Sequence, residues 1–479
     1  MTDMKKAAIE SVDSMAELCI SIADEIWENP ELSLKEYKAA ELYCKALREQ
    51  GFEVTEKLCG IDTAFCGSFG SGRPVIGILG EYDALSGLSQ RADVLKAEPV
   101  VHGGAGHGCG HNLLGAGAFA AALGIRNYLQ SSGKSGTVIF FGCPGEEGGS
   151  GKAFMAREGL WKNLDAALAW HPGDINEVRT GTNNSSLQVL YKYKGVAAHA
   201  ASCPDLGRSA LDAVELMNIG VQFLREHMME NCRIHYSILN AGGSSPNVVQ
   251  SEAEVLYMVR AGKVTESLKL LERVDKIAEG AALMTETSYE RMFIDGTAET
   301  LPNYTLERLM YRNFEELGVP KYTQEEVEYA AKMRSTFPKD DVIPGVGAKF
   351  EPEIAEKVLK LTENLTRPIY DFLMPEYNGN GVLPDSTDVG DVSWQTPTGH
   401  VHVVCWPGSM PAHAWQTVAC GKSSIAYKGM LCAGRVLTAT AIDLMEDEEL
   451  LEKARAEFAL RSRTGYVCPI EPDAVPIAL

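Results

Sequence analysis

Apolar residues recur at helical spacing through the first fifty residues of the chain. This spacing predicts two helices within residues 5–50. The stretch ENPELS at 28–33 separates them, because Pro30 cannot continue a helix. GFEV at 51–54 then begins a strand. This order is typical of the start of an α/β domain.

Continuous apolar runs further along the chain predict buried strands. They are PVIGILG at 74–80, TVIFFGC at 137–143, AALAWH at 166–171 and HVHVVCW at 400–406. The stretch 113–129 between the first two predicts a helix whose small residues allow close packing on a sheet. Such strands alternating with helices predict a mostly parallel sheet that is flanked by helices.

The middle of the chain follows a different pattern. Residues 187–194 and 252–260 alternate apolar with polar side chains, which predicts half-buried strands, and 209–228 between them predicts a helix. We therefore expect an inserted α+β module.

This module divides the chain into three parts. We predict a catalytic domain formed by 1–185 and 302–479, with the inserted domain at 186–301. Near the end, 423–445 predicts a long amphipathic helix followed by a Pro-rich tail. The charged, Pro- and Gly-punctuated segment 320–385 yields no definite element.

Composition narrows the class of protein. A chain of 479 residues with 45% hydrophobic and 23% charged residues is long enough for two globular domains. The net charge of −21 argues against nucleic acid and anionic membranes as partners. The N-terminus has acidic residues where a signal peptide is apolar, and no apolar run approaches the length of a membrane span. The 12 scattered cysteines indicate reduced thiols, so we expect a cytoplasmic protein.

Polar side chains follow each of the four apolar strands. They are Glu81 and Asp83, the pair Glu146 and Glu147, His171, and His413. Taken singly, each could have an ordinary structural role, such as a solvated acid pair or a hydrogen-bonded loop histidine. Ligands of an open α/β sheet gather at the carboxyl ends of its strands, so the coincidence over four strands favours a site.

The stretch GGAGHGCGHNLLGAG at 103–117 adds Cys109 and His111 to these candidates. A free cysteine is most often a small buried hydrophobe, but the surrounding glycines and histidines make that outcome less common here. His102 and His107 are not expected to be ligands.

These donors together are too many for a single four-coordinate zinc ion. They are Cys109, His111, Glu147, His171 and His413. Five such groups suit two divalent ions that share a bridging ligand, a centre that cleaves an amide without a protein nucleophile. The thiolate favours zinc, whereas carboxylate and imidazole also accept manganese. Of the adjacent acids, one can coordinate while the other handles protons.

Several longer strings resemble one protein family over nearly the whole chain. The chain resembles the M20 metallopeptidases, specifically their amidohydrolase branch, in the strings ENPELSLKEY, GEYDAL, GHGCGHN, PGEEGG, WHP, GVAAHAA and PAHAW. The resemblance implies a dinuclear metal-dependent amidohydrolase or carboxypeptidase that cleaves N-acyl or N-aroyl amino acids. The first candidate reaction is p-aminobenzoyl-glutamate to p-aminobenzoate and glutamate, a step of folate catabolism.

The resemblance also implies roles at the metal centre. Cys109 would bridge the ions, with His111 and Glu147 on one and His171 and His413 on the other. Glu146 would be the general base toward the attacking water, and Asp83 would orient a ligand. Glu81 occupies the position of a metal-binding histidine in other branches, so its role stays open.

The resemblance implies that the inserted module is a lid or dimerisation domain that supplies one catalytic residue, His199, and several residues that bind substrate. His199 would stabilise the oxyanion or a substrate carboxylate, often across a dimer interface. Asn247 and Arg260 would face the substrate's carboxylate, and Arg208 could also serve there. Arg260 could instead pair with a surface acid, and Asn247 could merely cap a turn.

Other functions remain open from the sequence. An aminoacylase or dipeptidase would have the same metal ligands. A cysteine hydrolase would use Cys109 as nucleophile but leaves Glu147, His171 and His413 without a role. A non-catalytic subunit of a heteromeric hydrolase is a third alternative, although the ligand set is complete. The partner is expected to be an identical chain or a related one.

Overall fold

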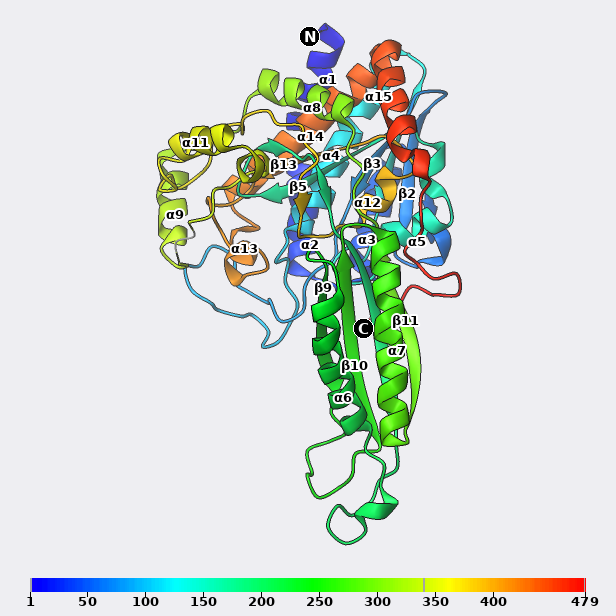
Figure 1. Cartoon of the computed structure of the whole chain (residues 1–479). Coiled ribbons are helices and arrows are strands. Elements are labelled where there is room, and N and C mark those ends of the chain that lie inside the picture. Colours follow the sequence, from blue (N-terminus) through cyan, green and yellow to red (C-terminus); the bar gives the residue numbers. More distant parts are fainter. Residues whose placement is uncertain (1, 339–340, 478) are drawn as a thin grey trace.

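The computed structural model describes residues 2–338, 341–477 and 479. Figure 1 shows a large α/β lobe from which an elongated arm projects. The arm consists of α6, α7 and the strands β8 to β11, and the remaining elements form the lobe.

The lobe is built around a seven-stranded sheet with the order β1-β2-β4-β3-β5-β13-β6. Its strands are Glu53–Glu56 (β1), Phe65–Ser71 (β2), Val75–Gly80 (β3), Gly136–Gly142 (β4), Ala166–Gly173 (β5), Glu177–Val178 (β6) and Thr398–Val404 (β13). The four central strands, β4, β3, β5 and β13, run parallel, whereas β1, β2 and β6 pair antiparallel. The expectation of a mostly parallel sheet is confirmed.

Helices cover both faces of this sheet. The helices of the lobe are Asp3–Ser14 (α1), Ala16–Glu28 (α2), Tyr37–Glu49 (α3), His111–Ser132 (α4), Gly151–Arg157 (α5), Tyr304–Leu317 (α8), Gln324–Arg334 (α9), Val346–Phe350 (α10), Pro352–Leu361 (α11), Val389–Ser393 (α12), Trp415–Cys420 (α13), Ser424–Glu446 (α14) and Glu448–Arg461 (α15). The central helix α4 packs between the sheet and α14. Its small residues permit this, because a Cβ at Gly117 would lie 2.5 Å from the Trp170 ring.

The arm is a four-stranded antiparallel sheet with the order β11-β8-β10-β9. Its elements are Ser185–Lys194 (β8), Ala210–Leu224 (α6), Arg233–Asn240 (β9), Glu252–Ala261 (β10), Val264–Thr285 (α7) and Ser288–Thr297 (β11). Both helices share a core with the sheet. The domain boundaries at 185/186 and 301/302 stay a prediction.

The structure differs from the sequence-based expectation in a few elements. The first predicted helix is divided at Met15 into α1 and α2. The expected Pro-rich tail is preceded by a further helix, α15, whose start is capped by the Asp447 side chain. The unassigned segment 320–385 contains α9, α10, α11 and the short strand Val382–Leu383 (β12), which pairs with Thr182–Asn183 (β7).

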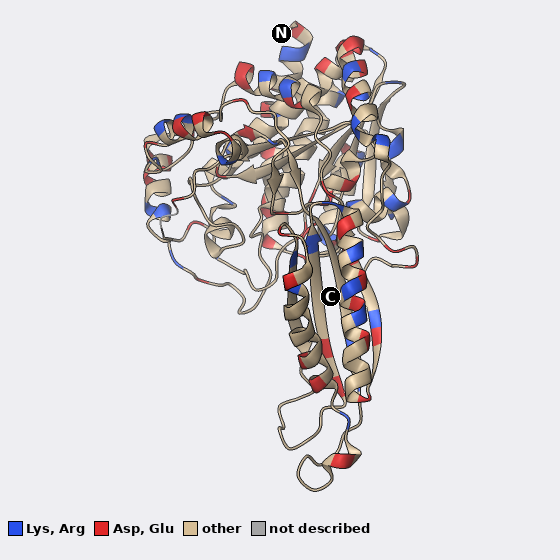
Figure 2. Ribbon diagram, viewed as in Figure 1, with Lys and Arg blue, Asp and Glu red and all other residues tan. Residues whose placement is uncertain are grey.

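Within the described residues, no helix is both long and apolar enough to cross a membrane. Lys and Arg are interspersed with Asp and Glu on the helices of both the lobe and the arm (Figure 2). Acidic residues outnumber basic ones in the chain as a whole, which has a net charge of −21.

Candidate metal centre

The predicted metal ligands come from separate segments that meet at the carboxyl edge of the sheet. Cys109 and His111 lie at the start of α4, Glu147 follows β4, His171 belongs to β5, and His413 precedes α13. Gly110 joins Cys109 to α4 in a left-handed conformation with φ of 77°. A side chain at that position would contact Pro172 and Trp406 at 2.9 Å, so glycine allows the loop to pass close to β5 and β13.

The donor atoms of these five residues form two sets that share Cys109. Cys109, His111 and His171 offer donor atoms that all lie within 4.8 Å of one another, as do Cys109, Glu147 and His413. Cys109 Sγ is 3.3 Å from His171 Nε2, and Glu147 Oε1 is 3.4 Å from His413 Nε2. A residue common to both sets is suited to bridge two ions.

The distances divide the ligands differently from the resemblance. They group His171 with His111 and His413 with Glu147, whereas the resemblance pairs Glu147 with His111. The relative placement of four loops decides this grouping, and no local sequence pattern encodes it. The assignment of ligands to each ion therefore stays a proposal.

Unpartnered buried atoms show that these residues fit divalent cations. His111 Nδ1 lies 2.9 Å from Asp83 Oδ1, while its Nε2 is buried without a hydrogen-bond partner, as is Glu147 Oε1. His171 Nδ1 lies 2.7 Å from the Pro172 carbonyl oxygen, which directs the lone pair of Nε2 toward Cys109. Buried polar atoms are rarely left unpaired without a reason, and bound cations would satisfy these.

Asp83 holds two of the predicted ligands, His111 and Glu147, in place. Its Oδ2 accepts hydrogen bonds from Ser33 Oγ at 2.8 Å and from the Glu147 backbone N–H at 2.9 Å, while Oδ1 faces His111. Burial alone would raise the pKa of Asp83, but the hydrogen bond and charge of His111 outweigh it and lower the pKa to about 2. Asp83 is therefore ionised and holds both His111 and the Glu147 loop.

The pKa values of the two adjacent glutamates shift in opposite directions. Burial, together with the charges of Glu81, Glu147 and Asp388, raises the pKa of Glu146 well above its ordinary value. Burial also opposes ionisation of Glu147, but the His413 ring nitrogen 3.4 Å away and the charge of His111 outweigh it and lower the pKa. Glu146 is thus the better proton acceptor and Glu147 the better ligand.

Sequence reasoning missed a buried ion cluster beside this centre. Lys152 Nζ lies 2.7 Å from Glu81 Oε1 and 2.5 Å from Asp388 Oδ1. Glu81, whose role the sequence left open, also places Oε2 3.3 Å from His111 Nε2. Lys152 was visible in the string GGSGK, but its partner Asp388 is 236 residues away.

A cavity of about 460 Å³ opens onto the donor sets. Cys109, Glu146, Glu147, His171 and His413 all line it. Arg260 of β10 reaches it from the arm and donates a hydrogen bond from Nη1 to Ser386 Oγ at 2.6 Å. The arm thus forms part of the cavity wall.

The other predicted substrate-binding residues are not among those that line this cavity. His199, Arg208 and Asn247 lie in the loops 195–209 and 241–251 beyond the ends of β8 and β10, at the tip of the arm (Figure 1). Arg208 Nε pairs there with Glu286 Oε2 at 2.8 Å. Within one chain the structure therefore does not bring these three residues to the metal ligands.

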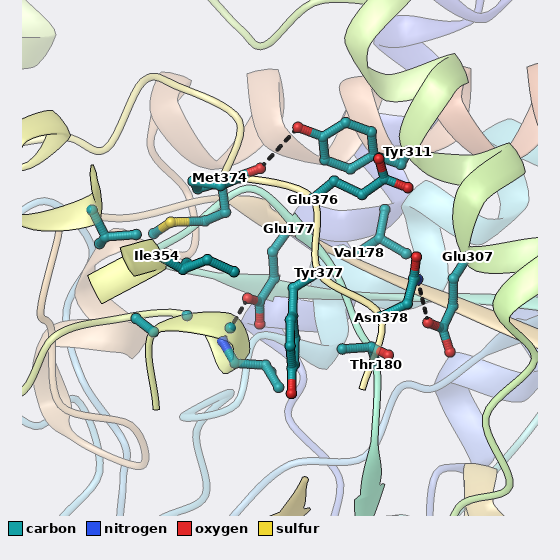
Figure 3. A pocket seen from close by; sticks show the side chains of 16 residues that line it. Glu177, Val178, Thr180, Glu307, Tyr311, Ile354, Met374, Glu376, Tyr377 and Asn378 are labelled. Atoms are coloured by element: carbon teal, nitrogen blue, oxygen red, sulfur yellow. Dashed lines mark hydrogen bonds between the residues drawn. The ribbon is translucent and has the colours of Figure 1, made fainter. Parts of the chain in front are cut away.

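A smaller cavity next to the main one has room for about one water molecule, about 10 Å³ (Figure 3). Glu307, which lines both cavities, accepts a hydrogen bond from Asn378 Nδ2 at 2.8 Å, and Tyr311 donates to the Met374 carbonyl at 3.2 Å. This space is too small for a substrate, and its residues pack together as part of the wall of the main cavity.

Known proteins are similar to the whole chain. Residues 77–413 match the peptidase family M20/M25/M40. The chain is 43% identical to one subunit of the p-aminobenzoyl-glutamate hydrolase of Escherichia coli (strain K12), covering 100% of both chains. It is 30% identical to the Xaa-Arg dipeptidase of Mus musculus, over 76% of this chain and 83% of that protein.

Solved structures share the fold at low sequence identity. A dinuclear metal-binding peptidase of the M20 family from Bacillus subtilis matches with a TM-score of 0.54 and 16% identity, covering 91% of this chain and 99% of that one. An aminobenzoyl-glutamate utilization protein from Klebsiella pneumoniae matches with a TM-score of 0.54 and 15% identity, covering 88% and 97%.

Proposed function

Because the chain belongs to peptidase family M20/M25/M40, we propose that it hydrolyses the amide bond of p-aminobenzoyl-glutamate to p-aminobenzoate and glutamate. The observation that carries this proposal is the 43% identity to one subunit of that hydrolase over the full length of both chains. The two donor sets that share Cys109 support a hydrolase with a divalent-metal centre.

The metal ligands of this proposal are the five residues of the two sets. Cys109 would hold both ions, with His111 and His171 for one and Glu147 and His413 for the other, as the distances favour. Zinc or manganese is the expected metal, because the set mixes a thiolate with imidazoles and a carboxylate. When bound, such ions supply Lewis-acid polarisation of a carbonyl and acidify water.

Glu146 is the proposed general base. It lines the cavity beside the metal ligands, and a carboxylate whose pKa is raised is a stronger base once it is ionised. Glu146 takes the proton from the attacking water and delivers it to the nitrogen of the leaving amine. Asp83 orients His111 and the Glu147 loop throughout.

Recognition of the glutamate carboxylates is assigned to cationic and amide side chains of the arm. Arg260 lines the cavity and is half-buried, which favours a charge-assisted hydrogen bond. His199, Asn247 and Arg208 contribute only from another chain or after movement of the arm, since they lie at its tip in this conformation.

The proposed partner is a second copy of the chain or a companion subunit, meaning a protein like the other subunit of the Escherichia coli hydrolase. Relatives named as two different subunits of that hydrolase support a heteromer. β9 is an edge strand whose Tyr236, Ile238 and Leu239 are exposed, and α6 beside it exposes Ile219 and Phe223. An open edge next to apolar side chains suits a protein interface.

The proposed location is the cytoplasm. All twelve cysteines carry free thiols. Thiols persist where the cellular environment is reducing, which supports this location.

The test is hydrolysis of p-aminobenzoyl-glutamate by the purified chain, alone and mixed with the companion subunit. Benzoyl-glycine and an Xaa-Arg dipeptide serve as competing substrates. We expect the highest kcat/KM for p-aminobenzoyl-glutamate and loss of activity after chelation. Preference for the dipeptide would contradict the substrate, and full activity after chelation would indicate Cys109 as a nucleophile.

A further inference from the structure

A buried cation lies beside the proposed metal centre. Lys152, at the start of α5, is 0% exposed, and its ammonium contacts Glu81 Oε1 at 2.7 Å and Asp388 Oδ1 at 2.5 Å. Asp388 Oδ2 also accepts a hydrogen bond from the Lys152 backbone N–H at 2.9 Å. The ammonium is therefore held firmly between two carboxylates, away from solvent.

Glu81 lies where a carboxylate could bind a metal ion. Its Oε2 is 3.3 Å from His111 Nε2, the buried nitrogen without a hydrogen-bond partner. Glu81, His111 and Glu146 offer donor atoms that all lie within 4.8 Å of one another. Imidazole and carboxylate are ordinary ligands of divalent ions, so the position alone does not exclude Glu81 from coordination.

What restrains Glu81 is the contact on its other oxygen. Oε1 is bound to Lys152, and Lys152 cannot follow Glu81 toward His111 because Asp388 binds it through both the ammonium and the backbone. The negative charge of Glu81 is thus already shared with a cation that is fixed in place. Glu146, by contrast, faces the cavity.

We propose that Lys152 is a positioning residue that keeps Glu81 from becoming a ligand of the ion beside His111. The inference rests on the proposed ligand set and deepens it. With Glu81 held back, His111 Nε2 is left to the ion, and Glu146 remains the carboxylate that meets the attacking water.

The test replaces the ammonium and follows the metal itself. Lys152→Met removes the charge and keeps the length of the side chain. Lys152→Met/Asp388→Asn removes one positive and one negative charge, so the buried net charge is unchanged and folding is protected. Cobalt(II) is the probe, because its visible absorption weakens as its coordination number rises.

We expect both variants to show weaker cobalt absorption than wild type and to bind cobalt more tightly, by about tenfold, since a charged ligand is gained. Adding Glu81→Gln should restore the wild-type spectrum, and Lys152→Arg should resemble wild type. If Lys152 merely supports the fold of the site, cobalt binding weakens about 10- to 100-fold whether or not Glu81 is present. That result, or an unchanged spectrum in both variants, overturns the inference.

The wild-type protein separates this failure from failure of the proposed centre. Cobalt bound by Cys109 gives a thiolate charge-transfer band that Cys109→Ser removes. If that band is absent from wild type, the ligand assignment fails. If it is present while the Lys152 variants match wild type, only the role of Lys152 fails.

Discussion

Among the described residues, Cys109 is common to both donor sets, and its replacement is therefore the sharpest test of a single side chain. Cys109→Ser keeps the shape of the side chain but replaces a thiolate with a hydroxyl that ionises poorly. We expect loss of most bound metal and of activity. Metal content per chain, measured after gel filtration beside wild type, checks this. Full metal occupancy in Cys109→Ser would contradict a bridging thiolate.

Replacement of Glu146, unlike that of Cys109, should reduce activity without loss of metal. Glu146→Gln removes the proton acceptor but leaves the five ligands in place. We expect wild-type metal content and a kcat reduced by about 10²- to 10⁴-fold, the usual contribution of a positioned base. Steady-state kinetics with metal analysis on the same sample provides the measurement. Parallel loss of metal and turnover would make Glu146 a ligand instead.

For individual side chains, the sequence predicts donors but not their partners. Glu147 and His413 can be identified because each lies in a segment that follows a buried strand, and His171 because it lies near the carboxyl end of one. The contact of Lys152 with Glu81 and Asp388 cannot, because it depends on how α5 lies relative to the residues that follow β3 and precede α12. A lysine in the glycine-rich string GGSGK looks like an ordinary exposed residue, and only the fold reveals that it is buried.

Between helices and strands, Arg260 links β10 of the arm to the segment before α12 of the lobe through Ser386. Arg260→Ala should raise KM for a dicarboxylate substrate about 10- to 100-fold, as expected for loss of a charged hydrogen bond of about 1.5–3 kcal/mol. Ser386→Ala is the matched control, because it breaks the link and retains the guanidinium. Equal effects of both variants would indicate that Arg260 only fastens the arm.

Asp391 in α12 joins the arm to the C-terminal tail and makes stability depend on pH. It accepts hydrogen bonds from Tyr466 Oη at 2.6 Å and from the Ala298 backbone N–H at 2.9 Å. Burial raises its pKa from 3.8 to about 8. The folded state therefore binds a proton that the unfolded state releases, so its contribution is complete below pH 4 and is lost as pH rises to about 8.

Asp391→Asn, which imitates the protonated acid, should flatten this dependence. Between pH 5 and 8, the free energy of unfolding of wild type should fall relative to the variant by at most about 1.4 kcal/mol per pH unit. Urea unfolding at a series of pH values measures it, with the exposed Asp473→Asn in the same tail as control. Parallel curves for wild type and Asp391→Asn would refute the expectation.

Helices and strands are predictable from sequence where burial leaves a clear pattern. β3, β4, β5 and β13 are continuous apolar runs because both faces of the sheet are covered. β2 escapes prediction, since its Gly67 lies under Leu47 and interrupts the apolar pattern. α15 escapes it because this helix buries only Leu451 and Ala454, too few positions to reveal a helical period.

In the molecule as a whole, the arm separates the predicted substrate residues from the metal ligands. Arg260 near its base reaches the cavity, whereas His199, Arg208 and Asn247 lie at its tip. The sequence could not predict this separation, because the spacing of motifs along the chain carries no information on how far a module projects. If the residues at the tip take part in catalysis, a second chain or a large movement of the arm must bring them in.

These two routes predict different results for a mixture of inactive variants. His199→Ala lacks the residue at the tip and Glu146→Ala lacks the base, so each should be inactive alone. In a dimer that exchanges arms, a mixed pair has one site with an intact base from one chain and an intact His199 from the other. Activity should therefore return when the two variants are unfolded together and refolded, and not when either is refolded alone.

If each chain instead closes its own arm over its own cavity, every site in the mixture lacks one residue and no activity returns. If a companion subunit supplies one of the two residues, adding it should restore activity to the variant that lacks that residue and not to the other variant. The variant that recovers therefore identifies the residue that the companion subunit supplies.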